Sequence, residues 1–228
     1  MDSEKSARVT HYRTIRKVNC GADKFVLVGL RKIHYVEAGK GPPMVLVPGS
    51  YNTYRIWNRL MPLLVEDSRL LALDYLGEFD YTVREQADLI AQIVRQLELG
   101  KVNLMGCAQG GAVVFDFATR YPELAGKIVS IGGHLIPPDE IRDKAKNPQS
   151  TTGSLHGHEE ATVFKSPFLY LYGTKTNKEL LLPKNLEFLQ KRLPQAWIVS
   201  LEGGIFETAL KNPQEVASLI QDFLKAKD

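Results

Sequence analysis

The side chains best suited to acid–base or nucleophilic chemistry in this sequence follow short apolar runs. Asp74 ends one such run, Cys107 ends another, and His134 follows a third after two glycines. An imidazole can act as a base near neutral pH, and a thiolate is a nucleophile when a base or positive charge activates it. A carboxylate can take part in proton transfer. These residues define a candidate site only if the fold brings them to one place.

Two further histidines have a spacing that metal sites sometimes use. His156 and His158 are two residues apart in a polar stretch. A histidine pair without further ligands is a weak signal for a metal site. We favour an ordinary polar loop there, and we predict no metal and no cofactor.

The elements that must position these residues alternate along the chain. Amphipathic stretches separate short apolar runs, which predicts a parallel sheet with helices on both faces. In such sheets the ligand site lies outside the carboxyl ends of the strands. The expected strands are 25–30, 33–36, 44–47, 70–73, 102–105, 128–131, 168–172 and 197–199, and the expected helices are 56–64, 87–97, 112–118, 186–189 and 216–224.

The composition is that of a folded protein, which we expect to be a single domain over residues 1–228. The chain has 44% hydrophobic residues, which excludes a disordered protein. No apolar run approaches the length of a membrane-spanning helix, and the polar start does not resemble a secretory signal. Two cysteines make no disulfide framework, so we expect a reducing, cytoplasmic environment. Residues 134–166 are polar and predict a short lid insertion.

Positive charge is concentrated at the beginning of the chain. Residues 1–32 contain eight Lys and Arg but three acidic residues, a local net charge of +5 in a chain of net charge +3. Such a segment can contact nucleic acid or an anionic surface. It can equally be a solvated edge whose charges oppose aggregation. We favour the second interpretation and expect neither a nucleic-acid nor a membrane partner.

The stretch VNLMGCAQGG at 102–111 resembles the nucleophile elbow of α/β-hydrolases, whose pattern is G-x-S-x-G. Residues 42–49 resemble the strand and oxyanion loop of that superfamily. Residues 203–206 and 212–215 resemble its histidine loop and last helix. The resemblance covers roughly residues 25–226 and implies the α/β-hydrolase fold, with a mostly parallel central sheet, helices on both faces and a short lid.

The resemblance also implies that all three positions of the catalytic triad are vacant. Ala108 stands at the nucleophile position, flanked by Gly106 and Gly110. Ile205 stands at the histidine position, and residues 173–177 contain no Asp or Glu where the acid is expected. A methyl group cannot attack a carbonyl, and an aliphatic side chain cannot accept a proton.

Three other residues are weak candidates for a catalytic role. Centring the elbow on Cys107 would place Met105 and Gln109 where glycines are needed, so we interpret this cysteine as a packed side chain. Asp74 resembles a structural aspartate that fixes the following turn, with catalysis as the alternative. His134 is either a base facing the crevice or a surface histidine that opens a polar loop.

A binding site is expected to survive without the triad. The superfamily's oxyanion hole is made of backbone N–H groups, here those of Gln109 and of Ser50 or Tyr51, at the amino end of a helix that attracts anions. The residues we expect to line the site are Ser50, Tyr51, Cys107, Gln109, Thr176 and Phe206.

Three functional hypotheses follow. The first is a pseudo-hydrolase that binds a small carbonyl or carboxylate ligand or a protein partner. The second is a cofactor-independent lyase, isomerase or atypical hydrolase that uses the oxyanion hole with His134 or Asp74. The third is an assembly role, including a homo-oligomer, with the pocket closed by Ile205 and Phe206.

Overall fold

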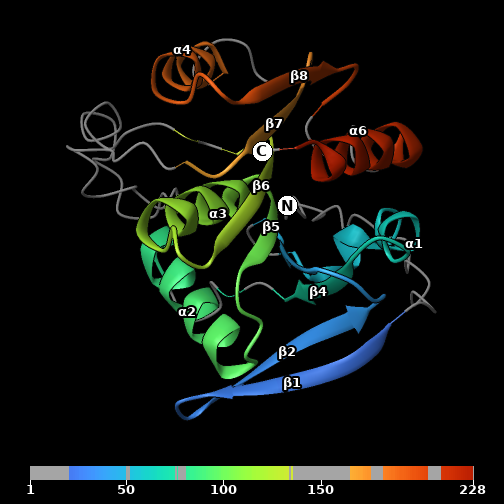
Figure 1. The fold of residues 1–228 in the computed structure, drawn as a ribbon, viewed down its shortest axis with the longest axis vertical. Helices are drawn as coiled ribbons and strands as arrows, with labels where there is room; N and C mark the ends of the chain where they lie inside the picture. Colours follow the sequence, from blue (N-terminus) through green and yellow to red (C-terminus); the bar gives the residue numbers. More distant parts are fainter. Residues whose placement is uncertain are drawn as a thin grey trace, which may run out of the picture.

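Eight strands form one twisted sheet in the computed structural model, which describes residues 21–49, 52–74, 76, 81–133, 135, 165–175, 182–204 and 212–227. The strand order is β1-β2-β4-β3-β5-β6-β7-β8 (Figure 1). The strands are β1 (Ala22–Val28), β2 (Arg31–Ala38), β3 (Pro43–Val47), β4 (Arg69–Leu73), β5 (Val102–Cys107), β6 (Ala125–Ile131), β7 (Phe168–Gly173) and β8 (Trp197–Leu201).

The sheet is parallel except at one edge, as the alternation of elements predicts. Strands β4, β3, β5, β6, β7 and β8 pair in parallel. β1 and β2 form an antiparallel hairpin, and β2 pairs antiparallel with β4. Gly29 begins the two-residue turn of the hairpin with a φ of 59°, a conformation that glycine adopts without strain.

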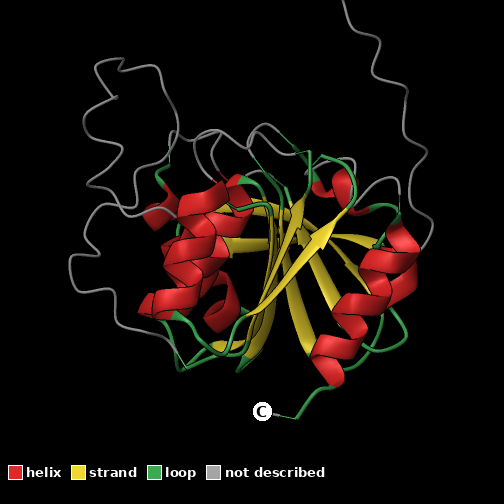
Figure 2. Ribbon diagram, turned by 90° about the horizontal axis from the view of Figure 1, so that it is seen from above, coloured by secondary structure: helices red, strands yellow, loops and turns green. Residues whose placement is uncertain are grey.

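Helices cover both faces of the sheet, as Figure 2 shows from above. α2 (Val83–Gln96), α3 (Gln109–Arg120) and α4 (Leu182–Arg192) contribute to one apolar cluster. The short 3₁₀ helix η1 (Tyr54–Trp57), α1 (Met61–Leu64) and α6 (Pro213–Lys225) contribute to the other. The two clusters bury the apolar side chains of both sheet faces. Because the strands from β4 to β8 are parallel, their carboxyl ends lie on one side of the sheet, between the two clusters.

One expected helix, over 56–64, is divided into two short pieces. η1 ends at Trp57 and α1 begins at Met61. Pro62 explains the break, because proline has no N–H to donate and is tolerated only in the first turn of a helix. By contrast, α2 begins four residues earlier than expected, because Thr82 and Glu85 form a capping box.

No helix in the described parts of the chain is long and apolar enough to cross a membrane. The lid expected at 134–166 lies outside the described residues, apart from Leu135, Lys165 and Ser166.

Candidate functional site

The turn between β5 and α3 has the strained geometry of a nucleophile elbow. Ala108 lies between the last residue of the strand and the first residue of the helix, with φ 50° and ψ −117°. A positive φ is unusual for a residue with a β-carbon, and such conformations persist only where the surroundings enforce them. The Ala108 N–H donates to the carbonyl of Ile131 on β6, and its carbonyl accepts from the Gly111 N–H. The methyl side chain is therefore held at the carboxyl edge of the sheet.

Glycines allow the helix to approach the strands closely around this turn. A β-carbon at Gly106 would lie 2.1 Å from the carbonyl oxygen of Gly110, and one at Gly110 would lie 2.2 Å from the carbonyl oxygen of Val47. Both separations are shorter than any real contact of this kind. The glycines predicted from the elbow pattern are therefore required by packing.

The carboxyl end of β3 meets the elbow. A β-carbon at Gly49 would lie 3.2 Å from the β-carbon of Ala108 and 3.1 Å from the carbonyl oxygen of Cys107. The N–H of Asn52 donates to the Gly49 carbonyl across 3.1 Å, which closes the loop that follows β3. Gly49, just before the residues that the sequence resemblance assigned to the oxyanion hole, therefore lies beside Ala108.

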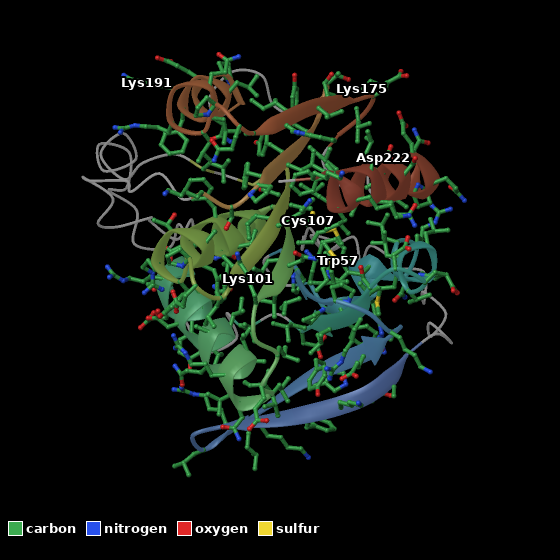
Figure 3. All side chains as sticks on the ribbon, viewed as in Figure 1. Trp57, Lys101, Cys107, Lys175, Lys191 and Asp222 are labelled. Carbon is green, nitrogen blue, oxygen red and sulfur yellow. The ribbon has the colours of Figure 1, made fainter. Side chains whose placement is uncertain are left out.

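Cys107 is packed beneath the turn. Its side chain is buried in the cluster that also holds Trp57, and Figure 3 shows both residues near the middle of the molecule. Burial raises the pKa of the Cys107 thiol to about 12. A thiol in such surroundings stays protonated and is a poor nucleophile.

Asp74 is tied to the neighbouring elements through both carboxylate oxygens. One oxygen accepts the backbone N–H of Tyr54 across 3.1 Å. The other lies 2.6 Å from Nδ1 of His34 on β2. The second ring nitrogen of His34 lies 3.2 Å from a carboxylate oxygen of Asp23 on β1. Asp74 thus connects the end of β4 to β2 and to η1.

A second polar cluster fixes the chain beyond the end of β6. The side-chain amide of Asn185 on α4 donates to the Gly133 carbonyl across 3.0 Å, and its oxygen accepts the N–H of Leu135 across 3.1 Å. The hydroxyl of Tyr170 also donates to the Gly133 carbonyl, and burial raises the pKa of this phenol to about 12. Asn185 therefore holds the backbone on both sides of position 134.

Neither His34 nor Asn185 was among the residues singled out from the sequence. His34 is 40 residues from Asp74, and Asn185 is 52 residues from Gly133. No local pattern marks such pairs.

Six sequence-predicted site residues lie outside the described parts of the chain: Ser50, Tyr51, His134, Thr176, Ile205 and Phe206. The structure brings Ala108, Cys107 and Gln109 together at the elbow, with Asp74 at the end of β4. It contains no cluster of three or more potential metal ligands among the residues that it describes.

Comparison with known sequences finds a family model and relatives that match about half of the chain. Residues 42–153 match the family model for the alpha/beta hydrolase fold. The chain is 35% identical over 129 residues to a pyrrolizixenacetamide deacetylase of Xenorhabdus hominickii, covering 53% of this chain and 48% of that protein. It is 32% identical over 126 residues to a 2-hydroxy-6-oxo-2,4-heptadienoate hydrolase of Pseudomonas putida, covering 50% and 46%. The alignments thus span about half the length of these relatives.

Solved structures resemble the chain over almost its whole length. Naproxen esterase of Bacillus subtilis aligns with a TM-score of 0.74 at 14% identity, covering 90% of this chain and 92% of the esterase. Carboxylesterase CesB of the same organism aligns with a TM-score of 0.71 at 17% identity, covering 91% and 93%. Together with the strand order and the strained turn at Ala108, these matches show that the chain has the α/β-hydrolase fold.

Proposed function

We propose that this protein is a pseudo-hydrolase: an α/β-hydrolase-fold protein that has lost ester and amide hydrolysis and binds a small carbonyl or carboxylate ligand. The observation that carries the proposal is Ala108 at the tip of the elbow, with φ 50° and ψ −117°. In hydrolases of this fold that turn carries the nucleophile. Here it carries a methyl group, which has no lone pair with which to attack a carbonyl.

The neighbouring thiol does not replace the missing nucleophile. Cys107 is buried, and desolvation raises its pKa to about 12. The sequence supports the same conclusion at the other triad positions, because Ile205 stands where the histidine is expected and residues 173–177 contain no acid. Nucleophile, base and acid act as a unit, so the loss of all three removes the reaction.

A ligand-binding role is supported by what the turn retains. The amino end of α3 directs backbone N–H groups toward the carboxyl edge of the sheet, and such helix ends attract anions and carbonyl oxygens. The loop at Gly49 runs beside this helix end. Both relatives compared above have names that specify carbonyl-bearing compounds, an acetamide and an oxo-dienoate. A short fatty acid or an aromatic acid carries a carboxylate that the helix end would attract, and this is the ligand class that we propose.

The contacts of Asp74 weigh against the alternative of a lyase or isomerase with Asp74 as its base. Both oxygens of this carboxylate are engaged, one with the Tyr54 N–H and one with His34. Those contacts give Asp74 a structural role in joining β4 to β2. The other base considered from the sequence, His134, lies outside the described residues.

Thermal-shift measurements with hexanoate and benzoate test the proposed ligand class. We expect millimolar concentrations to raise the melting temperature of the wild-type protein, whereas hexylamine should not, because a cation is repelled by the helix amino end. A matched pair of variants tests whether the acid binds at the turn that carries Ala108. Ala108→Asn and Ala108→Asp have side chains of equal size and meet the same backbone strain at this turn, but only Asp adds a negative charge.

The acid-dependent shift should be retained in Ala108→Asn more than in Ala108→Asp. Equal shifts in both variants, or equal effects of hexanoate and hexylamine, would contradict an anion site at this helix end.

A further inference from the structure

The hairpin of β1 and β2 carries three of the four large exposed apolar residues in the described part of the chain. Phe25 is 54% exposed, Leu27 63% and Leu30 fully exposed at 104%. The other large exposed apolar residue in the described chain, Trp197, lies on β8 at the opposite edge of the sheet. We call Phe25, Leu27 and Leu30 the hairpin patch.

The hairpin patch arises from the alternation of side chains along the strand. Val26 and Val28 point into the core and are almost fully buried, so Phe25 and Leu27 lie on the other face of β1. Leu30 stands in the turn that joins the two strands. A hairpin that only closed the edge of the sheet would need apolar residues on its inner face alone. These outward apolar side chains have no role in the core.

The tip of the hairpin extends beyond the carboxyl end of the neighbouring strand β4, and the elbow also lies at the carboxyl ends of the parallel strands. β2 pairs with β4 only through the segment from Tyr35 to Ala38. The part of β2 from Arg31 to His34 therefore continues past Leu73, the carboxyl end of β4. In Figure 1 the hairpin forms the lower margin of the molecule. The turn therefore lies at an outer margin of the described molecule.

Positive charge accompanies the apolar side chains at the tip. Lys32 pairs with Leu27 across the hairpin, and its ammonium lies 4.0 Å from the centre of the Phe25 ring. Arg31 follows the turn directly, with its guanidinium 5.0 Å from the centre of the Tyr81 ring. The acidic residues of the hairpin lie away from the turn, where Asp23 contacts His34 and Glu37 binds both Arg69 and Lys24. In residues 21–32, the described part of the basic segment 1–32, Lys24, Arg31 and Lys32 stand against Asp23 alone, a net charge of +2.

We propose that the hairpin patch docks the protein on an anionic lipid bilayer, with Leu27 and Leu30 entering the interface and the cations facing lipid phosphates. Apolar side chains beside Lys and Arg are the combination that binds such surfaces. A nucleic acid would use the same positive charge. Its bases stack on aromatic rings, however, and gain little from two leucine side chains. From the sequence alone we favoured a solvated edge for this basic segment and expected no membrane partner; the exposed leucines beside its cations favour an anionic surface instead.

Co-sedimentation of the full chain with vesicles tests this proposal. We expect the protein to bind vesicles of phosphatidylcholine mixed with phosphatidylglycerol and to bind pure phosphatidylcholine much more weakly. Added salt should weaken the binding, because it screens the cations. Leu27→Ser combined with Leu30→Ser should lower the partition coefficient at least about tenfold, since two exposed leucines lose their transfer out of water.

Charge variants provide a matched comparison. Lys32→Glu should weaken binding, whereas Lys191→Glu should not, because Lys191 lies on α4, far from the hairpin (Figure 3). Circular dichroism and thermal unfolding confirm that each variant is folded. A Leu30→Trp variant gives an independent readout, because brominated lipids should quench the emission of a tryptophan that enters the bilayer.

The proposal is wrong if the wild-type protein does not bind the anionic vesicles, or if both hairpin variants bind them as well as Lys191→Glu does. It is also wrong if a fluorescent oligonucleotide binds more tightly than the vesicles and the two leucine changes leave both affinities unaltered. In that case the positively charged residues bind nucleic acid.

Discussion

A β-carbon at Gly106 would lie 2.1 Å from the carbonyl oxygen of Gly110, so the strand before Ala108 and the helix after it touch through their backbones. This contact fixes the tight turn at which Ala108 takes its positive φ. The architecture of the elbow is therefore enforced by packing and stays in place without a nucleophile. Folding depends on this turn, as does the ligand binding that we propose, and substitutions at neighbouring positions separate the two.

Gly106→Ala should destabilise the protein by about 3 kcal/mol or more, because the new methyl group meets backbone atoms that cannot move aside. Gly100→Ala is the control. That glycine has a φ of 68°, and a β-carbon there would have no other atom within 4 Å, so only a backbone cost of about 1 kcal/mol is expected. Urea denaturation measures both. Equal losses would mean that the elbow relaxes more easily than its geometry indicates.

Ala108→Gly should stabilise the protein by about 0.5–1 kcal/mol, since glycine adopts a positive φ without the clash of a β-carbon. Ala112→Gly, in the interior of α3, should instead destabilise it by about 1 kcal/mol. Chemical denaturation of the two variants reports the difference. If both changes destabilise alike, the turn at Ala108 stores no strain.

Ala108→Ser should not restore esterase activity, because a serine without a histidine beside it is barely nucleophilic. The measurement is covalent labelling by a fluorophosphonate, with an active serine esterase run in parallel. We expect no labelling of Ala108→Ser above that of the wild-type protein. Labelling at a rate close to that of the esterase would show that a base is available and that only the nucleophile is missing.

The sequence allowed the fold to be predicted because its strands contain short apolar runs that amphipathic stretches separate. The turn at Ala108 was also predictable, since glycines at fixed offsets mark it. The division of the helix over 56–64 was missed, although Pro62 is a local signal for it. The contacts of His34 with Asp74 and of Asn185 with Gly133 could not be predicted in the same way. They depend on how distant segments meet in three dimensions.

The free energy of unfolding should fall at acid pH, partly because Glu37 becomes protonated. Burial raises the pKa of this carboxyl, but the hydrogen bonds from Arg69 and Lys24 outweigh burial and lower the pKa below its ordinary value of 4.5. A lowered pKa in the folded state stabilises above the unfolded pKa, and this contribution is lost as the pH falls through the folded pKa. Above about pH 5, the free energy of unfolding of the wild-type protein should therefore exceed that of Glu37→Gln by about 1 kcal/mol.

That difference should shrink progressively below about pH 4.5. Urea unfolding of both proteins across this range measures it. Arg69→Met should weaken the same pH dependence, since it removes two of the hydrogen bonds to Glu37. A difference that stays constant well into the acid range would show that the carboxylate charge does not contribute to folding.

The proposed function requires that the site at Ala108 binds an anionic or carbonyl ligand without a nucleophile. An NMR titration of the ¹⁵N-labelled protein with hexanoate tests it most directly, through the backbone amide signals of Gly110 and Gly111 in the first turn of α3. We predict saturable shifts of these two signals in the wild-type protein and in Ala108→Asn, and at least about tenfold weaker binding in Ala108→Asp. If saturating hexanoate leaves both signals unmoved, or moves them equally in Ala108→Asn and Ala108→Asp, the site is not a carboxylate site and the proposed function is wrong.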